Sequence, residues 1–199
     1  IVNGGRGVPA DIKTIQYFTI STQGNGSVFG DLSTEDNGGS GASNAVRGLL
    51  HLSGTPSANV EFITIATLGD SVDFGNLQSE GSGNGAVGDG IRGIFNLSYV
   101  APATTNILEY VTIAQTGNAK DFGDLSVARR NQKGNVSSPV RGVWAGGQNP
   151  DAVNIIDYIQ IQTLGNAADF GDLTQSSREG PGCADAVRGL FASGSGGTD

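Results

Sequence analysis

The sequence has one cysteine, one histidine and no methionine among its 199 residues. The lone Cys183 excludes an internal disulfide and any metal site built from several cysteines. The lone His51 has no nucleophile motif beside it, so a His-dependent hydrolase is not indicated. Neither an 18-residue apolar run nor a signal-peptide pattern occurs, so the sequence predicts no membrane insertion or targeting. It starts at Ile1 without a Met, which is typical of a processed chain or of a piece of a longer one.

Positive charge is also scarce. Eleven Lys and Arg stand against nineteen Asp and Glu, which gives a formal net charge of −8. Nucleic-acid-binding proteins usually carry a basic stripe, so this balance disfavours a nucleic-acid partner. An acidic surface favours solubility and specifies no partner by itself.

Glycine, in contrast, is abundant, and its 33 residues recur at fixed places between apolar segments. Four segments align without a gap, at spacings of 45, 48 and 48 residues: 15–32, 60–77, 108–125 and 156–173. Each contains a Gly-Asn or Gly-Asp step followed by Phe-Gly-Asp-Leu or Phe-Gly-Asn-Leu. The sequence therefore predicts a tandem repeat of about 47 residues.

Each repeated segment opens on a strand that is apolar on both faces. In the fourth copy, Ile156 and Tyr158 face one side, and Ile159 and Ile161 face the other. A half-exposed strand would alternate apolar with polar residues, so this strand is expected to be covered on both sides. Small sheets stacked on one another, as in a propeller, provide such cover. We therefore predict an all-β fold, a tandem four-unit, propeller-like β repeat within a single domain, residues 1–199.

An Arg-Gly step before each repeated segment marks the unit boundaries. The first step is Arg6-Gly7-Val8, and the units span about 6–46, 47–91, 92–140 and 141–187. A fifth step, Arg188-Gly189, lies in a closing strand over 187–194 that no repeated segment follows. An unpaired strand exposes backbone N–H and C=O groups, so we expect it to add to the first unit of the same chain or of a neighbouring subunit. Closure within the chain is favoured, because a tethered strand has a high local concentration.

The arginines of the repeat are candidates for binding an anionic ligand. They are Arg47, Arg92 and Arg141. The alternative is structural, with each arginine paired to the aspartate of Phe-Gly-Asp in its own or a neighbouring unit. Those aspartates are Asp31, Asp124 and Asp172. The structural interpretation is favoured because one such pair would satisfy a partly buried charge in every unit.

Oxygen-bearing side chains recur at positions i, i+3 and i+6 of the turn. In the third and fourth copies they are Asn118, Asp121, Asp124, Asn166, Asp169 and Asp172. Calcium prefers such ligands, although the spacing of an EF-hand loop is absent. Capping of the turn by Asn and Asp side chains explains the pattern without a metal. We therefore expect no cofactor, with Ca²⁺ as the alternative.

Two isolated features remain. Trp144 is the single tryptophan, and we weigh stacking on a sugar against core filling; its counterparts Leu50, Phe95 and Phe191 are all apolar, which favours core filling. The opening residues 1–5, Ile-Val-Asn-Gly-Gly, look like the mature N-terminus of a trypsin-like protease. No Gly-Asp-Ser-Gly-Gly follows, so we interpret this match as coincidence.

The run Arg141-Gly142-Val143-Trp144-Ala145-Gly146-Gly147, with Tyr158-Ile159-Gln160-Ile161 and Asp169-Phe170-Gly171-Asp172-Leu173, resembles a kelch-like repeat. We associate this pattern with structural proteins of tailed bacteriophages, particularly marine and cyanobacterial ones. The resemblance covers nearly the whole chain and is best in the third and fourth copies. It implies a location in the virion rather than a chemistry.

These features together predict a non-enzymatic virion structural or binding module, such as a fibre, tail or capsid-decorating protein. It would attach to a host surface or a neighbouring subunit, with other virion proteins, a second copy of itself or a host-surface glycan as partners, in the virion or outside the cell. One alternative is a lectin or adhesin with a glycan pocket in each blade. Another is an extracellular filament subunit that assembles by strand exchange. No organised acid, base or nucleophile points to an enzyme.

Overall fold

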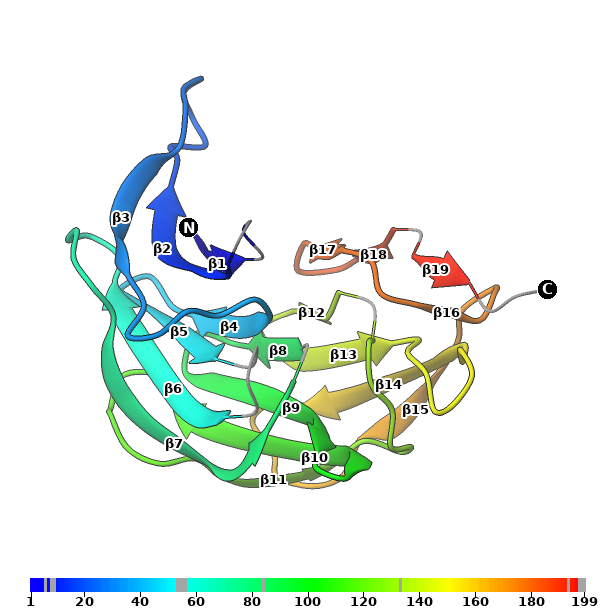
Figure 1. Ribbon diagram of the computed structural model, residues 1–199. Helices are drawn as coiled ribbons and strands as arrows, with labels where there is room; N and C mark the ends of the chain where they lie inside the picture. The colour runs from blue at the N-terminus through cyan, green and yellow to red at the C-terminus, as the bar shows by residue number, and fades with distance from the viewer. Residues whose placement is uncertain are drawn as a thin grey trace.

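The computed structural model describes residues 1–5, 7, 10–52, 57–83, 85–132, 134–192 and 194–196 (Figure 1). These residues form strands and turns, with no helix among them, as the sequence predicts. No helix in this part of the chain is long and apolar enough to cross a membrane. Every strand pairing in the sheets is antiparallel.

Most sheets consist of strands that follow one another in the sequence. The first has three strands, β1 (Val2–Gly5), β2 (Ile12–Tyr17) and β3 (Ser27–Asp31). The second has four, β4 (Gly39–Ser43), β5 (Arg47–Leu52), β6 (Ser57–Thr64) and β7 (Val72–Gly81). The third is β8 (Gly85–Gly88), β9 (Arg92–Val100), β10 (Ala103–Thr112) and β11 (Lys120–Asp124). The fourth is β12 (Val136–Ser137), β13 (Arg141–Ala145), β14 (Ile155–Gln160) and β15 (Ala168–Asp172). Two short pairs follow, β17 (Gly182–Ala184) with β18 (Gly189–Phe191), and β16 (Ser177–Arg178) with β19 (Ser195–Gly196).

The two outer strands of these four sheets pair in the same register. Ile15, Val60, Leu108 and Ile156 lie opposite Gly30, Gly75, Gly123 and Gly171, respectively. The register shifts at the next residue in all four sheets, which marks a β-bulge. Gly75, Gly123 and Gly171 have φ angles of +139°, +139° and +132°, a backbone conformation that favours glycine. The Phe-Gly-Asx element is therefore the bulged edge strand of each sheet.

Successive sheets pack face to face, and a separate apolar core fills each junction. The core between the first and second sheets contains Ile15, Phe29, Leu32, Leu50, Leu52 and Ile63. The next contains Leu49, Val60, Phe74, Leu77, Phe95, Leu97, Val111, Ile113 and Ala119. The third contains Val87, Ile94, Leu108, Phe122, Leu125, Trp144, Ile159 and Ile161. These cores explain why the repeated strand is apolar on both faces. The second and third sheets each contact a neighbouring sheet on either side.

The sheets follow one another along an arc, with β1–β3 at one end and β17–β18 at the other (Figure 1). The first strands of successive sheets, β4, β8, β12 and β17, contact one another in that order on the inside of the arc. The described strands do not close into a ring. Among the described residues, β18 pairs with β17 alone, so the prediction that the closing strand joins the first unit of the same chain does not hold for them.

A strand precedes the Arg6-Gly7-Val8 step, from which the first unit was predicted to start. The strand that pairs with β2 is β1, Val2–Gly5, while Arg6 and Val8 lie outside the described residues. Gly4 and Gly5 have φ angles of +57° and +131°, close to the +61° and +108° of Gly146 and Gly147. Residues 1–5 therefore occupy the place of residues 143–147, which accounts for the protease-like opening residues.

Candidate functional site

Each Gly-Asx turn docks on the Phe-Gly-Asx element of the preceding sheet. The amide of Gly117 donates to the Phe74 carbonyl, and that of Ala119 donates to the Asn76 carbonyl, both at 2.8 Å. The Asn118 Oδ1 accepts from the Asn76 amide at 3.0 Å. Equivalent bonds of 2.7–3.1 Å join the first sheet to the second and the third to the fourth, through Gly69, Asp70, Ser71, Gly165, Asn166 and Ala167. The turns therefore hold the sheets together.

Glycine at the bulge makes this docking possible. A Cβ atom on Gly30, Gly75 or Gly123 would collide with the backbone of the docked turn. At Gly171, the equivalent position of the fourth sheet, the same atom would meet open space. Of the four bulges, only that of β15 is left uncovered by a turn of the described residues.

The residues predicted as calcium ligands lie along these turns. Asn118 and Asn166 each accept a backbone N–H from the preceding sheet, and Asp169 accepts the N–H of Gly171 at 2.9 Å. Asp121 and Asp169 are exposed on the edge strands, and Asp124 and Asp172 end those strands. Across the described ranges, no three or more His, Cys, Asp or Glu side chains come together as metal ligands would.

A set of buried carboxylates escaped the sequence-based prediction. Glu61, Glu109 and Asp157 occupy the same strand position and are each at most 3% exposed. Each accepts a backbone N–H from the preceding sheet, namely that of Ser33, Gln78 or Ser126, at 2.7–3.2 Å. Burial raises the pKa of Glu109; the N–H of Gln78 opposes this shift and the charge of Asp121 adds to it. The sequence does hold a sign of these buried oxygens, because an otherwise apolar strand carries a side-chain oxygen at the same position in all four copies. The residues are Gln16, Glu61, Glu109 and Asp157.

The fourth sheet adds a buried cation to this arrangement. The guanidinium of Arg129 lies 2.7 Å from Asp157, and both side chains are fully buried. Arg129 also donates to the Trp144 carbonyl at 3.3 Å. The Trp144 side chain is 0% exposed within the third core, so in this structure it offers no surface for stacking on a sugar.

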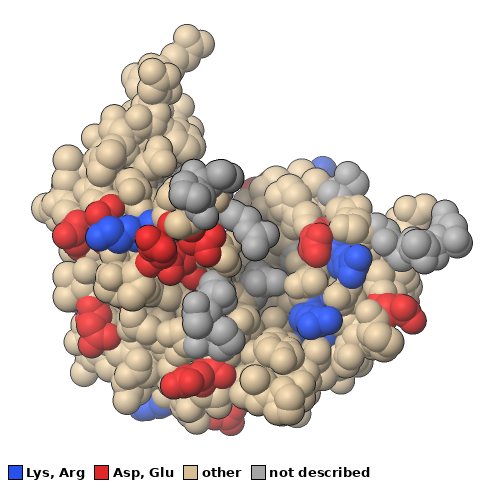
Figure 2. All heavy atoms as spheres, in the orientation of Figure 1, with Lys and Arg blue, Asp and Glu red and all other residues tan. Residues whose placement is uncertain are grey.

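The arginines of the repeat stack on aromatic rings. The guanidinium carbons of Arg47, Arg92 and Arg141 lie 4.7–5.1 Å from the ring centres of Phe62, Tyr110 and Tyr158, respectively. Arg47 and Arg92 also reach the next sheet, where they donate to the carbonyls of Ile113 and Ile161 at 3.2 and 3.0 Å. The predicted arginine–aspartate pairs are not formed: the ion pairs of the described residues are Lys13–Asp31 and Arg129–Asp157. Figure 2 shows Lys and Arg on this face of the molecule as separate side chains rather than as a continuous patch.

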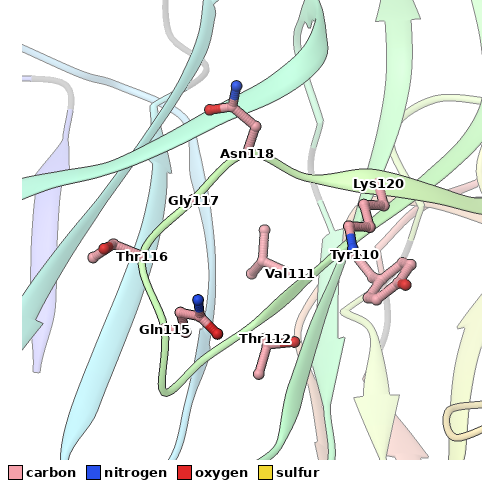
Figure 3. Close-up of a pocket in the computed structure, with 8 residues that line it drawn as sticks. All are labelled: Tyr110, Val111, Thr112, Gln115, Thr116, Gly117, Asn118 and Lys120. Atoms are coloured by element: carbon pink, nitrogen blue, oxygen red, sulfur yellow. The ribbon is translucent and has the colours of Figure 1, made fainter.

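A small polar pocket lies at the turn between β10 and β11 (Figure 3). The turn curls around Val111, Lys120 lies beside the ring of Tyr110, and Asn118 points away from Gln115. Its volume is about 180 Å³, below the range of about 300–1,000 Å³ that is usual for ligand sites. The pocket therefore holds water-sized groups more readily than a sugar ring.

A larger cavity, of about 430 Å³, lies at the end of the array, between the fourth sheet and the β17–β18 hairpin. Ile156 and Phe170 line it on the sheet side, and Val187 and Phe191 line it on the hairpin side. Phe170 is 53% exposed, whereas Phe29, Phe74 and Phe122 are at most 5% exposed. We call this surface of β12–β15, which includes Phe170, Gly171 and Asp172, the C-terminal face.

The opposite end of the array is equally open. We call the outer surface of β2–β3, with Phe18, Ile20 and the Gly24-Asn25-Gly26 turn, the N-terminal face. Phe18 and Ile20 are 55% and 93% exposed. Their counterparts in the fourth sheet, Ile159 and Ile161, are 2% and 0% exposed. Both terminal sheets thus expose positions that are core positions in the junctions between sheets.

Comparison with known proteins gives a likeness in fold. No family model and no curated protein matches the sequence. Among solved structures, a chain of hydrazine synthase from Kuenenia stuttgartiensis superposes with a TM-score of 0.53 at 12% sequence identity. The match covers 78% of this chain and 48% of that chain, so this chain matches about half the length of that protein. At this identity the likeness concerns the fold alone.

Proposed function

We propose that the four sheets are blades of a propeller-like array, with one blade for each repeat of the sequence and a fifth begun by β17 and β18. The common register of the outer strands supports this assignment. We call the contact in which a Gly-Asx turn docks on the Phe-Gly-Asx bulge of the preceding sheet a turn-on-bulge junction. Its three copies support the assignment further, because two turn amides donate to the carbonyls of the Phe and the Asx residue each time. In such an array, each blade contacts and stabilises its neighbours.

The array serves as a non-enzymatic structural and binding module of the virion type. One observation carries this proposal: the polar side chains that recur in every repeat join one sheet to the next, while two apolar faces lie exposed at the ends. Asn118, Glu109 and Arg92 each contact a neighbouring sheet. Exposed apolar surfaces of this kind are typical of protein–protein contacts. The phage-like repeat motif supports a location in the virus particle.

Quantitative mass spectrometry of purified virus particles tests this function. Peptides of this chain should sediment with the particles at the copy number of a structural protein, and detergent washing should leave that number unchanged. The proposal is wrong if the peptides stay in the particle-free fraction. A glycan array on the purified chain serves as the second measurement, because saturable binding at several equivalent sites would replace the proposed role by that of a lectin.

A further inference from the structure

The two end faces of the array carry the two halves of one junction. In the two junctions that the third sheet makes with its neighbours, the preceding sheet contributes a bulge and an arginine, and the following sheet contributes a Gly-Asx turn and an isoleucine carbonyl. The C-terminal face has the first set, with the bulge at Phe170-Gly171-Asp172 and Arg141 stacked on Tyr158. The N-terminal face has the second, with Gly24-Asn25-Gly26 and Ile20.

We propose that the C-terminal face of one copy of this chain binds the N-terminal face of a second copy. By the pattern of the internal junctions, the amides of Gly24 and Gly26 donate to the carbonyls of Phe170 and Asp172. The Asn25 Oδ1 accepts the amide of Asp172, and Arg141 donates to the carbonyl of Ile20. Phe170 and Ile20 then become buried, as Phe122 and Ile161 are at the internal junction.

The β17–β18 hairpin has the features of the inner half of a sheet. Asp185 accepts the amides of Val187 and Arg188 at 2.7 Å, as Asn44 accepts those of Val46 and Arg47 at 2.8 and 2.7 Å in the turn between β4 and β5. The hairpin therefore supplies two inner strands, and β2 and β3 of the second copy supply two outer ones. Together they make one four-stranded sheet, which fills the 430 Å³ cavity.

In the composite sheet, β18 of one copy and β1 of the second copy would occupy overlapping positions beside β2. Val2 lies opposite Gln16, in the register in which Trp144 lies opposite Asp157. Phe191 occupies the Trp144 position in the repeat, so Val2 and Phe191 compete for one place in the composite sheet. Ile1 competes with Leu190 in the same way. Asn3 lies opposite Ile15 as Ala145 lies opposite Ile156, so it competes with Ala192. One of the two segments, residues 1–3 or residues 190–192, must therefore leave the sheet when the second copy binds.

The second copy is favoured as the occupant for two reasons. The complementary surface is present on the chain itself, and it repeats a junction that already forms three times within the structure. The two faces differ from each other, so the contact is heterologous and extends beyond a dimer unless a ring closes. The inference rests on the proposed structural role and names the partner of its end faces.

Two substitutions, one on each face, test the contact. Phe170→Glu places a carboxylate on the C-terminal face, and Ile20→Glu places one on the N-terminal face. Both side chains are at least half exposed, so the fold of the single copy should persist. Ile91→Glu is the matched control, because Ile91 is 62% exposed in the turn between β8 and β9, away from both faces.

Analytical ultracentrifugation at increasing concentration gives the result. The wild-type chain and Ile91→Glu should form species larger than a dimer. Phe170→Glu and Ile20→Glu should each be monomeric, with self-association weakened by about a hundredfold or more, since each would bury an unpaired charge. An equimolar mixture of the two variants should form a heterodimer and nothing larger, because one intact face remains on each.

Three outcomes would overturn the inference. These are a wild-type chain that stays monomeric at high micromolar concentration, variants that assemble like the wild type, and a mixture that stays monomeric. A monomeric wild-type chain whose two variants melt at lower temperature would select closure within one chain instead. The ultracentrifugation uses purified chain alone, so a chain absent from virus particles that still forms the heterodimer would refute the proposed function and leave this inference standing.

Discussion

Arg129 and Asp157 form an ion pair with an Nη1–Oδ2 distance of 2.7 Å inside the fold, where neither side chain has contact with solvent. Removal of one partner leaves a buried charge without compensation. Arg129→Met should therefore lower the free energy of unfolding by about 3–5 kcal/mol in urea denaturation. Lys13→Met is the control, because the Lys13–Asp31 pair is 51% and 38% exposed. Its loss should be within about 1 kcal/mol, and equal losses for the two variants would contradict this account.

The two phenylalanines Phe122 and Phe170 hold the same place in the repeat but differ in burial, at 2% and 53% exposed. Phe122→Ala should destabilise the chain by about 3–5 kcal/mol, because it leaves a cavity in the third core. Phe170→Ala should cost less than half of that amount when measured on dilute, monomeric protein. Thermal unfolding of the two variants provides the comparison. A loss at Phe170 as large as that at Phe122 would show that the C-terminal face is covered in solution.

Asn118 tests the turn-on-bulge junction. Asn118→Leu removes the acceptor for the Asn76 amide, which should cost about 1–3 kcal/mol. Asn118→Asp should be close to neutral, because Asp70 plays the same part at the preceding junction. Asn25→Leu is the matched control, since Asn25 lies in the turn of the exposed N-terminal face. Chemical denaturation of the dilute protein should show Asn25→Leu close to the wild type.

Metal removal should leave the stability of the protein unchanged. The Asn118 and Asn166 oxygens already accept backbone hydrogen bonds, so the turns hold together without a cation. Dialysis against a calcium chelator is expected to leave the thermal midpoint where it was. A midpoint that fell on chelation and recovered with Ca²⁺ would instead identify Asn118, Asp121 and Asp124 as ligands.

His51 should make the folded state weaker at low pH. Burial lowers the pKa of its ring from 6.5; the Ser57 carbonyl and the charge of Asp36 only partly offset this effect. Below that value the unfolded chain takes up a proton that the folded chain does not, so stability falls as the pH decreases. The slope is at most about 1.4 kcal/mol per pH unit.

The substitution His51→Asn isolates this contribution, because His51 is the only histidine and Asn96 holds the matching place in the third sheet. Urea midpoints measured from neutral pH down through 6 should slope for the wild type and flatten for the variant. Parallel curves for the two proteins would show that other groups cause the change.

The recurring Phe-Gly-Asx element was predictable because glycine leaves a strong trace in the sequence. The bulge at Gly75 and Gly123 and the close approach of the next turn both require glycine, so the Phe-Gly-Asx element recurs at fixed spacing. The prediction that the strand is apolar and covered on both faces followed from the same spacing. Leu108 and Val111 of β10, which lie in different cores on either side of the third sheet, confirm it. These features depend on local backbone geometry, which a repeat reproduces in every copy.

The junction chemistry was harder to predict, because it depends on contacts between sheets. Glu109 looks like a solvated residue in the sequence, yet it is buried against the Gln78 amide. Arg92 was expected to pair with an aspartate, whereas it stacks on Tyr110 and reaches the Ile161 carbonyl. A side chain that bonds to a backbone atom can do so at almost any residue, so the sequence does not reveal which residue is its partner. The strand Val2–Gly5, which pairs with β2, was not among the predicted elements, because the Arg-Gly motif marks Arg6-Gly7 instead.

The turn-on-bulge junction also bears on how such a chain changes in evolution. Its hydrogen bonds on the preceding sheet use backbone atoms of the Phe-Gly-Asx element, and on the following sheet they use backbone amides and one Asx oxygen. An in-frame duplication of one 48-residue period, the spacing between the last three copies, inserts a unit that already fits both neighbours. Unequal recombination between repeats can therefore lengthen or shorten the gene product by whole sheets, with no compensating substitution at the new contacts.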